Sequence, residues 1–332
     1  MCSHGQDWVW DRAKRVGQGL QAHKLPQPFF RGPDDAYSVK ASFATDQGDV
    51  NISFFVWSPL TSRHKSALIE AHPFPERADF NVGLKVGLMN DCLADAVIYS
   101  GTNGHPIRKA MMSAICEAIG GVPRELSPAR LDEIDCDTTN SPPDRPLVFV
   151  TESLGSKMLF DAVRKLWAAA GSKSESARAN LTRRLASLDI MFMVANQIPL
   201  LDQANPIRRG DPTKPYSSGV DDVVSIINEA RSSLRAKGQR VSSEPISIVA
   251  FSDPNDLLSY RWQRKDAEIT QARLINVFVS NDWTYFGSVE RPDTAHCGYA
   301  SNKYVIGLIA RGFSGGPDLP EAGASSAPQC LN

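Results

Sequence analysis

The 332-residue chain has no excess of charge of either sign, because 36 Lys and Arg residues stand against 37 Asp and Glu residues and the formal net charge is −1. Proteins that bind nucleic acid or an anionic membrane surface usually carry a marked basic excess. The chain also has no uninterrupted apolar run of the ~18 to 20 residues that cross a bilayer. Its most apolar stretch, residues 190–201, contains Asn196, Gln197 and Pro199. We therefore expect no nucleic-acid partner and no transmembrane segment.

Three sequence motifs that hold cofactors are also missing. No Gly-x-Gly-x-x-Gly follows a strand-like segment, and neither Gly-x-x-x-x-Gly-Lys-Ser/Thr nor His-Glu-x-x-His occurs. These motifs bind dinucleotides, nucleoside phosphates and zinc, respectively. The six Cys residues are scattered, without the close Cys and His spacing of a zinc site. We therefore expect a protein that needs neither a cofactor nor a metal.

The Cys residues and the N-terminal segment indicate in which compartment of the cell the protein is expected. Six isolated Cys residues are typical of reduced thiols in a cytosolic protein, although an even number is also compatible with disulfides. The N-terminal residues 1–15 contain no apolar segment of the kind that forms the middle of a signal peptide. We therefore expect reduced cysteines and a cytoplasmic location.

Apolar residues amount to 42% of the chain, which is ordinary for a globular protein with a large core. Short, nearly continuous apolar runs alternate with segments whose apolar residues recur every three or four positions. This alternation predicts an α/β fold, with a mainly parallel central sheet and helices on both faces. The predicted strands are 51–57, 95–99, 147–150, 188–194, 246–251 and 274–279, and the predicted helices are 107–119, 157–170, 220–234 and 302–310.

The chain is interpreted as three parts. Residues 1–45 are weakly patterned and form an N-terminal extension, whereas residues 46–312 hold the alternating strands and helices of the main domain. Residues 313–332 are rich in Gly, Pro, Ala and Ser and predict a flexible tail. Within the main domain, residues 202–244 are polar and longer than a simple crossover needs. Both a lid or insertion over one end of the sheet and a surface loop with one crossover helix fit this segment.

The segment most informative about function is 151–155, Thr-Glu-Ser-Leu-Gly. It lies between the predicted strand 147–150 and the predicted helix 157–170, so Ser153 stands on a tight turn beyond the carboxyl end of the strand. The helix N-terminus offers backbone N–H groups and a positive dipole end beside such a serine. The small Gly155 allows strand and helix to approach closely. A simpler interpretation is that Ser153 caps the helix.

This segment resembles the nucleophile elbow of the α/β-hydrolases, Gly-x-Ser-x-Gly, with Thr151 in place of the first Gly. In that family the order along the chain is nucleophile, acid and then His. His296 is the sole His after Ser153, and it follows the last predicted strand. The resemblance implies a serine esterase or lipase-like enzyme in which Ser153 is the nucleophile and His296 its base.

The acid of the implied triad has three candidates. Asp256 lies a few positions past the predicted strand 246–251, where the family usually carries its acid, and it precedes two apolar residues. Asp253 is nearer to the end of the strand and precedes a Pro. Asp202 follows the strand before, a position that some lipase-like members use. We favour Asp256, although Asp253 and Asp256 also suit the capping of a turn.

The resemblance further implies an oxyanion hole made of two N–H donors. One is the backbone N–H of Leu154, next to the nucleophile. The other would come from the loop after the first predicted strand, where Pro59 has no N–H and Ser58 or Leu60 is left. The family's usual His-Gly pair is absent from this loop, and residues 70–73, Glu-Ala-His-Pro, offer a second candidate loop.

The sequence thus predicts a cofactor-free serine hydrolase for a small ester or lipid-like substrate. The strict Gly-x-Ser-x-Gly pattern at 312–316 is rejected, because no strand precedes Ser314 and neither a helix nor a His follows it. One rival is a non-catalytic α/β-hydrolase-fold binding protein with a degraded elbow, which Thr151 and the missing His-Gly pair favour. The other is an enzyme that uses Cys92 or Cys297 as nucleophile.

Overall fold

The structure is a computed structural model, and the chain divides into two compact units. Unit 1 comprises residues 1–107, 253–257 and 278–332, and unit 2 comprises residues 108–252 and 258–277. The residues that the structure describes are 6–22, 29–31, 37–46, 48–71, 78–126, 133–138, 146–171, 175–201, 219–262, 272–284 and 290–312.

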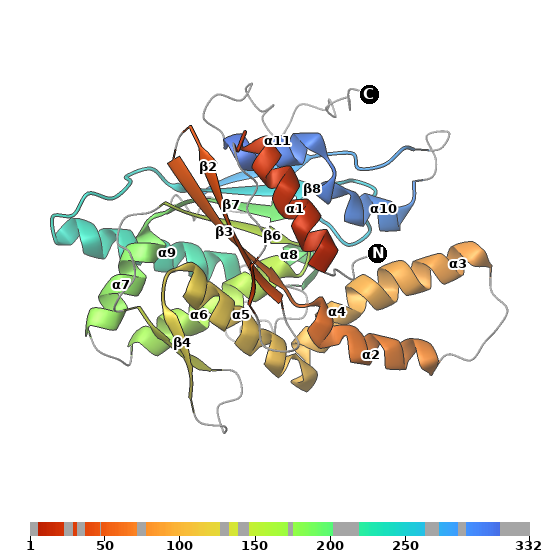
Figure 1. Ribbon diagram of the computed structural model, residues 1–332, viewed down its shortest axis with the longest axis horizontal. Coiled ribbons are helices and arrows are strands. Elements are labelled where there is room, and N and C mark those ends of the chain that lie inside the picture. Colours follow the sequence, from red (N-terminus) through yellow and green to blue (C-terminus); the bar gives the residue numbers. More distant parts are fainter. Residues whose placement is uncertain are drawn as a thin grey trace, which may run out of the picture. The chain divides into compact units, whose positions relative to one another are not determined.

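Within the described residues, unit 2 is built around a four-stranded sheet (Figure 1). Its strands, in spatial order, are β6 (Leu147–Glu152), β7 (Leu188–Val194), β8 (Ile246–Ser252) and β9 (Ala272–Phe278). β7 pairs in parallel with both β6 and β8. The last four predicted strands are therefore confirmed, as is an α/β organisation with a parallel sheet flanked by helices.

The connections between the parallel strands contain helices, as parallel pairing usually requires. They are α6 (Gly155–Gly171) and α7 (Glu175–Ala186) between β6 and β7, then α8 (Ile198–Leu201) and α9 (Gly219–Ala236) between β7 and β8. α6 and α9 confirm the helices predicted there. α9 is the crossover helix of the segment 202–244, and residues 202–218 lie outside the described residues.

α6, α7 and α9 pack against one another. In α9 the buried residues Val220, Val223, Val224 and Ile227 recur at three- and four-residue spacing. β8 is buried along nearly its whole length and β7 over its last four residues, which explains the apolar runs there. Each fully buried aliphatic side chain of this kind contributes ~1.5 to 3 kcal/mol to stability.

A buried arginine ties α9 to the start of β7. The guanidinium of Arg231 donates to the carbonyl oxygens of Ala186, Leu188 and Glu244 at 3.3, 2.8 and 2.6 Å, and to Asp189 Oδ1 at 2.6 Å. Burial lowers the pKa of Arg231, although the nearby Asp189 acts in the opposite direction. Since these bonds satisfy the backbone where the chain enters the sheet, Arg231 is a structural residue.

A disulfide joins the remaining elements of unit 2. They are α5 (His105–Ala118), whose first residues belong to unit 1, and the antiparallel pair β4 (Val122–Glu125) and β5 (Ile134–Asp137). Cys116 at the end of α5 is bonded to Cys136 in β5, and Cys92 is also in a disulfide. The expectation of reduced cysteines is therefore wrong for these three residues. Cys297 is not part of a disulfide.

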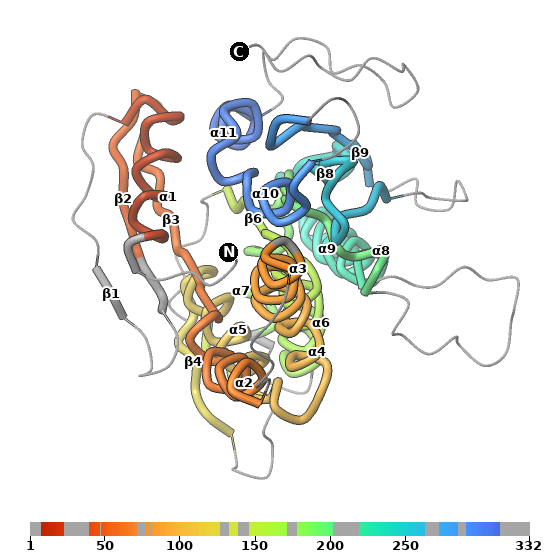
Figure 2. Tube along the Cα trace, turned by 90° about the vertical axis from the view of Figure 1, so that its right-hand side faces the viewer, coloured from red at the N-terminus to blue at the C-terminus, as the bar shows by residue number. Residues whose placement is uncertain are grey.

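In unit 1, α1 (Gln6–Gly19) packs on an antiparallel sheet, as Figures 1 and 2 show. The strands of this sheet are β1 (Phe29–Arg31), β2 (Tyr37–Thr45) and β3 (Gly48–Val56). β3 confirms the first predicted strand, and Ala13 of α1 packs against Ala41 and Phe43 of β2. The weakly patterned segment 1–45 therefore contains a helix and strands that the sequence does not predict.

Helices follow β3, and one of them replaces a predicted strand. They are α2 (Ser58–Glu70), α3 (Asp79–Leu84), the π-helix η1 (Lys85–Leu93), α4 (Ala94–Ser100) and the short 3-10 helix η2 (Thr102–Gly104). The strand predicted at 95–99 is wrong, because these residues form α4. Asp95 there accepts the indole N–H of Trp57 at 3.0 Å and pairs with buried Lys65 at 3.0 Å. These contacts help to hold α4 against α2.

The last elements of unit 1 are short helices that carry the predicted His. They are α10 (Pro292–Cys297), the 3-10 helix η4 (Gly298–Ala300) and α11 (Lys303–Arg311). α11 confirms the last predicted helix and contacts α1. Asn302 caps α11, since its side-chain oxygen accepts the N–H groups of Tyr304 and Val305 at 3.0 and 3.3 Å.

Candidate active site

Ser153 occupies a sharp turn between β6 and α6. Its φ is 55°, in the left-handed region that residues other than glycine rarely adopt. Its backbone N–H donates to the carbonyl of Val194 at the end of β7, at 2.8 Å, which holds the turn against the neighbouring strand. Strained backbone of this kind is concentrated at functional sites. The conformation is the one expected for a serine that projects from a strand–helix junction.

Thr151, the departure from the family pattern, is accommodated by hydrogen bonds. Its Oγ1 lies 2.7 Å from Ser156 Oγ in α6 and donates to the carbonyl of Phe192 in β7 at 3.3 Å. Both Thr151 and Ser156 are buried. The larger residue therefore links β6, β7 and α6 and does not prevent the close approach of strand and helix.

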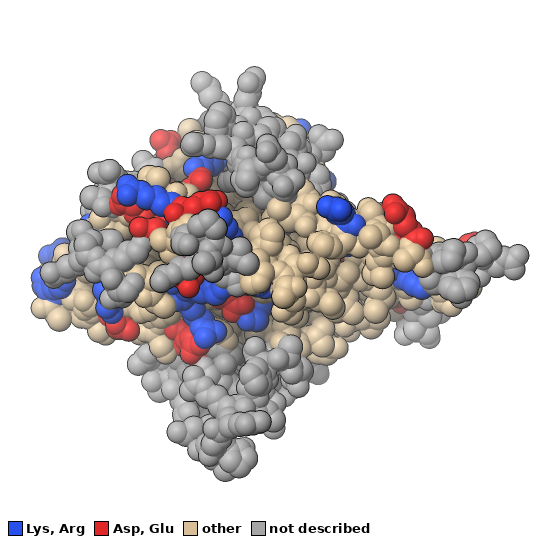
Figure 3. Space-filling model, turned by 90° about the horizontal axis from the view of Figure 1, so that it is seen from below, with Lys and Arg blue, Asp and Glu red and all other residues tan. Residues whose placement is uncertain are grey.

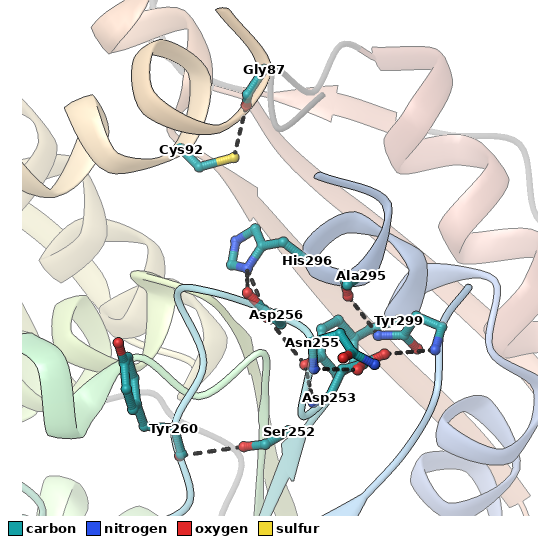
Figure 4. Close-up of polar contacts among 11 residues, drawn as sticks. Gly87, Cys92, Ser252, Asp253, Asn255, Asp256, Tyr260, Ala295, His296 and Tyr299 are labelled. Carbon is teal, nitrogen blue, oxygen red and sulfur yellow. Dashed lines mark hydrogen bonds and ion pairs between the residues drawn. The ribbon is translucent and has the colours of Figure 1, made fainter. Parts of the chain in front are cut away.

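His296 and Asp256 form a buried pair in unit 1 (Figure 4). Nδ1 of His296, on α10, lies 2.9 Å from both carboxylate oxygens of Asp256, in the loop that follows β8. The two residues are 2% and 3% exposed. A carboxylate at Nδ1 fixes the proton of a neutral imidazole on that nitrogen, so Nε2 carries the lone pair and can take up a proton.

Asp253 has a different role from Asp256. One of its carboxylate oxygens accepts the backbone N–H of Asn255 at 2.9 Å, and the other accepts that of Asn281 at 2.7 Å. Burial raises the pKa of Asp253, while these two backbone hydrogen bonds lower it. Asp253 thus joins the loop after β8 to the loop after β9. Of the sequence candidates, it is Asp256 that contacts His296, and Asp202 lies outside the described residues.

Sequence reasoning missed Tyr299, which is fully buried beside the pair. Its hydroxyl donates to Asp256 Oδ2 at 3.1 Å and accepts the backbone N–H of Asp253 at 2.6 Å. A usable signal is present in the sequence, because side chains three positions apart share one face of a helical segment and Tyr299 is three positions after His296.

A second missed group holds the segment that carries His296. The side-chain amide of Asn281 donates to the carbonyl of Ala295 at 2.7 Å, and Asn302 donates to Asn281 Oδ1 at 2.9 Å. Gly298 lies against this amide, since a Cβ at position 298 would be 2.7 Å from Asn281 Cβ. The position of His296 therefore depends on a polar network that joins α10 to the loop after β9 and to the start of α11.

The expected oxyanion donors lie at the first turns of two helices. Leu154 directly precedes α6 in unit 2, and Ser58 is the first residue of α2 in unit 1. The backbone N–H of Leu60 donates to the carbonyl of Trp57 at 2.9 Å. The structure brings Asp256 and His296 into contact, and it describes Ser153 and Leu154 within unit 2.

The remaining sequence candidates have less support. Cys92 is disulfide-bonded and therefore is not a thiol nucleophile. Residues 70 and 71 end α2, whereas His72 and Pro73 of that candidate loop lie outside the described residues, as does Ser314 with the tail 313–332.

On the face shown in Figure 3, basic and acidic side chains are interspersed. No described helix is both long and apolar enough to cross a membrane. Among the same residues, no three His, Cys, Asp or Glu side chains are grouped so that they could hold a metal ion.

Comparisons of the chain with models of known protein families, with curated proteins and with solved structures find no match.

Proposed function

We propose that the chain is a serine hydrolase that cleaves carboxylic esters through Ser153, His296 and Asp256. The observation that carries the proposal is the buried hydrogen bond between His296 and Asp256. An imidazole held by a carboxylate at one nitrogen is the general base that a serine nucleophile requires. The left-handed Ser153 at a strand–helix junction supports the assignment of the nucleophile.

Chain connectivity supports the combination of Ser153 with the pair. β6 and β8 belong to one parallel sheet, so their carboxyl ends lie at the same edge. Ser153 is the first residue after β6, and Asp256 is the fourth after β8. Ligands of α/β proteins bind outside the carboxyl ends of the strands, which is where this proposal places the chemistry.

The proposed reaction has two steps that use the same groups. Ser153 Oγ attacks the ester carbonyl carbon while His296 Nε2 takes the hydroxyl proton, and the N–H groups of Leu154 and Ser58 stabilise the oxyanion. The C–O bond to the alcohol breaks, and His296 returns the proton to the leaving alkoxide. Water then attacks the acyl-enzyme, again with His296 as base and then acid, and releases the carboxylic acid. Asp256 holds the tautomer of His296 and stabilises the imidazolium.

Labelling with a fluorophosphonate probe, together with hydrolysis of p-nitrophenyl acetate, tests this proposal. The wild type should react with the probe and release p-nitrophenol, and Ser153→Ala should do neither. Ser314→Ala is the matched control, because it removes the serine of the strict motif and should retain both activities. Labelling that persists in Ser153→Ala or is lost in Ser314→Ala would contradict the assignment.

A second candidate function is binding of an ester-like ligand without turnover. The absence of a His-Gly pair after β3 favours it, since the loop then lacks the family's usual oxyanion element. The hydrogen-bonded Thr151 gives it no further support. A wild-type protein that binds a short-chain ester in calorimetry but neither reacts with the probe nor hydrolyses the ester would select this candidate.

A further inference from the structure

We propose that Tyr299 is a positioning residue: its hydroxyl donates to Asp256 and fixes the orientation of the carboxylate that determines which nitrogen of His296 acts as the base. This inference rests on the proposed function and deepens it. Tyr299 is on η4, directly after the helix that carries His296, and its hydroxyl contacts both Asp253 and Asp256.

The direction of each hydrogen bond follows from the backbone of Asp253. A backbone N–H can only donate, so Tyr299 Oη accepts the 2.6 Å bond from Asp253 N. The phenolic proton is then directed to the second partner, Asp256 Oδ2 at 3.1 Å. Because His296 Nδ1 also approaches both oxygens of Asp256, the carboxylate acts as acceptor on both sides. That arrangement favours a proton on Nδ1 of a neutral His296.

Two buried carboxyl groups are close neighbours in this loop. Burial raises the pKa of Asp253, and the negative charge of Asp256 raises it further. The carboxylate oxygens of Asp253 accept hydrogen bonds from the backbone N–H groups of Asn255 and Asn281. Asp256 instead accepts a hydrogen bond from the hydroxyl of Tyr299. Each of the two carboxyl groups therefore has its own hydrogen-bond donors, and Tyr299 is one of those that hold Asp256.

The other charged groups near the pair cannot replace this proton. Asp293, on the same helix as His296, is a carboxylate bonded to Arg291 at 2.7 Å. Glu290 is a further carboxyl group, whose pKa is raised by burial and then by the charges of Asp253 and Asp282. η1 packs against α10 and contributes Cys92, which is disulfide-bonded and does not titrate (Figure 4).

NMR of the 15N-labelled imidazole of His296 tests the proposal in Tyr299→Phe and in Tyr299→3-fluorotyrosine. Phe lacks the hydroxyl that donates to Asp256, so the carboxylate should form a stronger hydrogen bond with His296. The Nδ1–H proton resonance should therefore move downfield. In the pH profile of kcat/KM for p-nitrophenyl acetate, the acidic limb should move to higher pH by about half a unit. This is less than the ~1 to 3 units by which a full neighbouring charge shifts a pKa. Fluorine makes the phenol a stronger donor, so both shifts should reverse sign.

Tyr304→Phe on α11 is the matched control, because it removes the same hydroxyl from a side chain that is 38% exposed. Equal shifts in this control, or unchanged resonances and an unchanged limb in both Tyr299 variants, would overturn the proposal. If Tyr299→Phe does not fold, the fluorotyrosine variant decides, because it keeps the hydrogen bonds. The resonance does not require turnover, so a wild type that hydrolyses no ester refutes the proposed function while the spectra still decide the role of Tyr299.

Discussion

Replacing Asp256 by Asn perturbs the proposed triad at the bond that defines the base. Asn has the size of Asp but carries one oxygen and one NH2 group. The hydroxyl of Tyr299 requires an acceptor at the Oδ2 position, so we expect the oxygen of Asn to face Tyr299. The NH2 group then faces His296 Nδ1, which must accept with a lone pair. The proton of the neutral ring moves to Nε2, the nitrogen that should receive the proton of Ser153.

The expected loss is large because the pair is nearly excluded from water. His296 and Asp256 are 2% and 3% exposed, so solvent does not readily restore the original tautomer. In serine proteases the same substitution lowers kcat by ~10⁴, chiefly through the wrong tautomer. At about 1.36 kcal/mol for each tenfold change in rate, that is ~5.4 kcal/mol of transition-state stabilisation. We expect Asp256→Asn to lower kcat/KM by ~10³ to 10⁴ at neutral pH.

The assay is hydrolysis of p-nitrophenyl acetate, with circular dichroism as a check that the variant is folded. Asp253→Asn is the matched comparison, because it changes the neighbouring carboxylate in the same loop and leaves the bond between Asp256 and His296 intact. We expect this variant to lose stability and at most about tenfold in kcat/KM. A larger loss in Asp253→Asn than in Asp256→Asn would refute the assignment of the acid. So would an Asp256→Asn protein that keeps more than about a tenth of the wild-type rate.

Three further predictions concern stability. Arg231→Met removes the hydrogen bonds to three carbonyl groups and one carboxylate. The free energy of unfolding measured in urea should therefore fall by ~2 to 5 kcal/mol. A fall of less than ~1 kcal/mol would contradict the structural role of Arg231. Gly298→Ala places a Cβ 2.7 Å from Asn281 Cβ and 3.1 Å from its carbonyl oxygen, so Tm and kcat/KM should both fall, and an unchanged Tm would argue against this packing. Burial raises the pKa of Asp253 in the folded protein. The stability that Asp253 contributes is therefore full at a pH below the pKa of an unperturbed Asp, about 3.9, and is lost as the pH rises through the pKa in the folded protein. Denaturation across this acidic range should therefore show the wild type losing stability relative to Asp253→Asn as pH rises, and parallel pH profiles would refute the sign.

The strands of the parallel sheet could be predicted because their burial leaves a direct trace in the sequence. β8 is covered along nearly all of its length and β7 over its last four residues, so apolar residues follow one another there without alternation. The prediction for 188–194 matches β7 from its first residue to its last. The amphipathic α6 and α9 were recognisable for the related reason that helices on a sheet bury one face.

The segment 95–99 shows where this reasoning fails. Asp-Ala-Val-Ile-Tyr is a short apolar run, and such a run does not distinguish a buried strand from a turn of buried helix. The contacts that accompany the helix are an ion pair between Asp95 and Lys65 and a hydrogen bond from Trp57. Both partners lie about 30 to 40 residues earlier in the chain, so no local pattern contains them.

The choice between Asp253 and Asp256 was ambiguous in sequence for a related reason. Both carboxylates follow β8 within four residues, and both suit a turn. What separates them is the supply of backbone N–H groups: two reach Asp253, one from its own loop and one from Asn281, 28 residues later. Asp256 instead contacts side chains, His296 and Tyr299, which the chain brings back after a further strand. A carboxylate bonded to backbone N–H groups fixes a loop, whereas one bonded to an imidazole orients that ring, and so the same residue type makes two kinds of contact three positions apart.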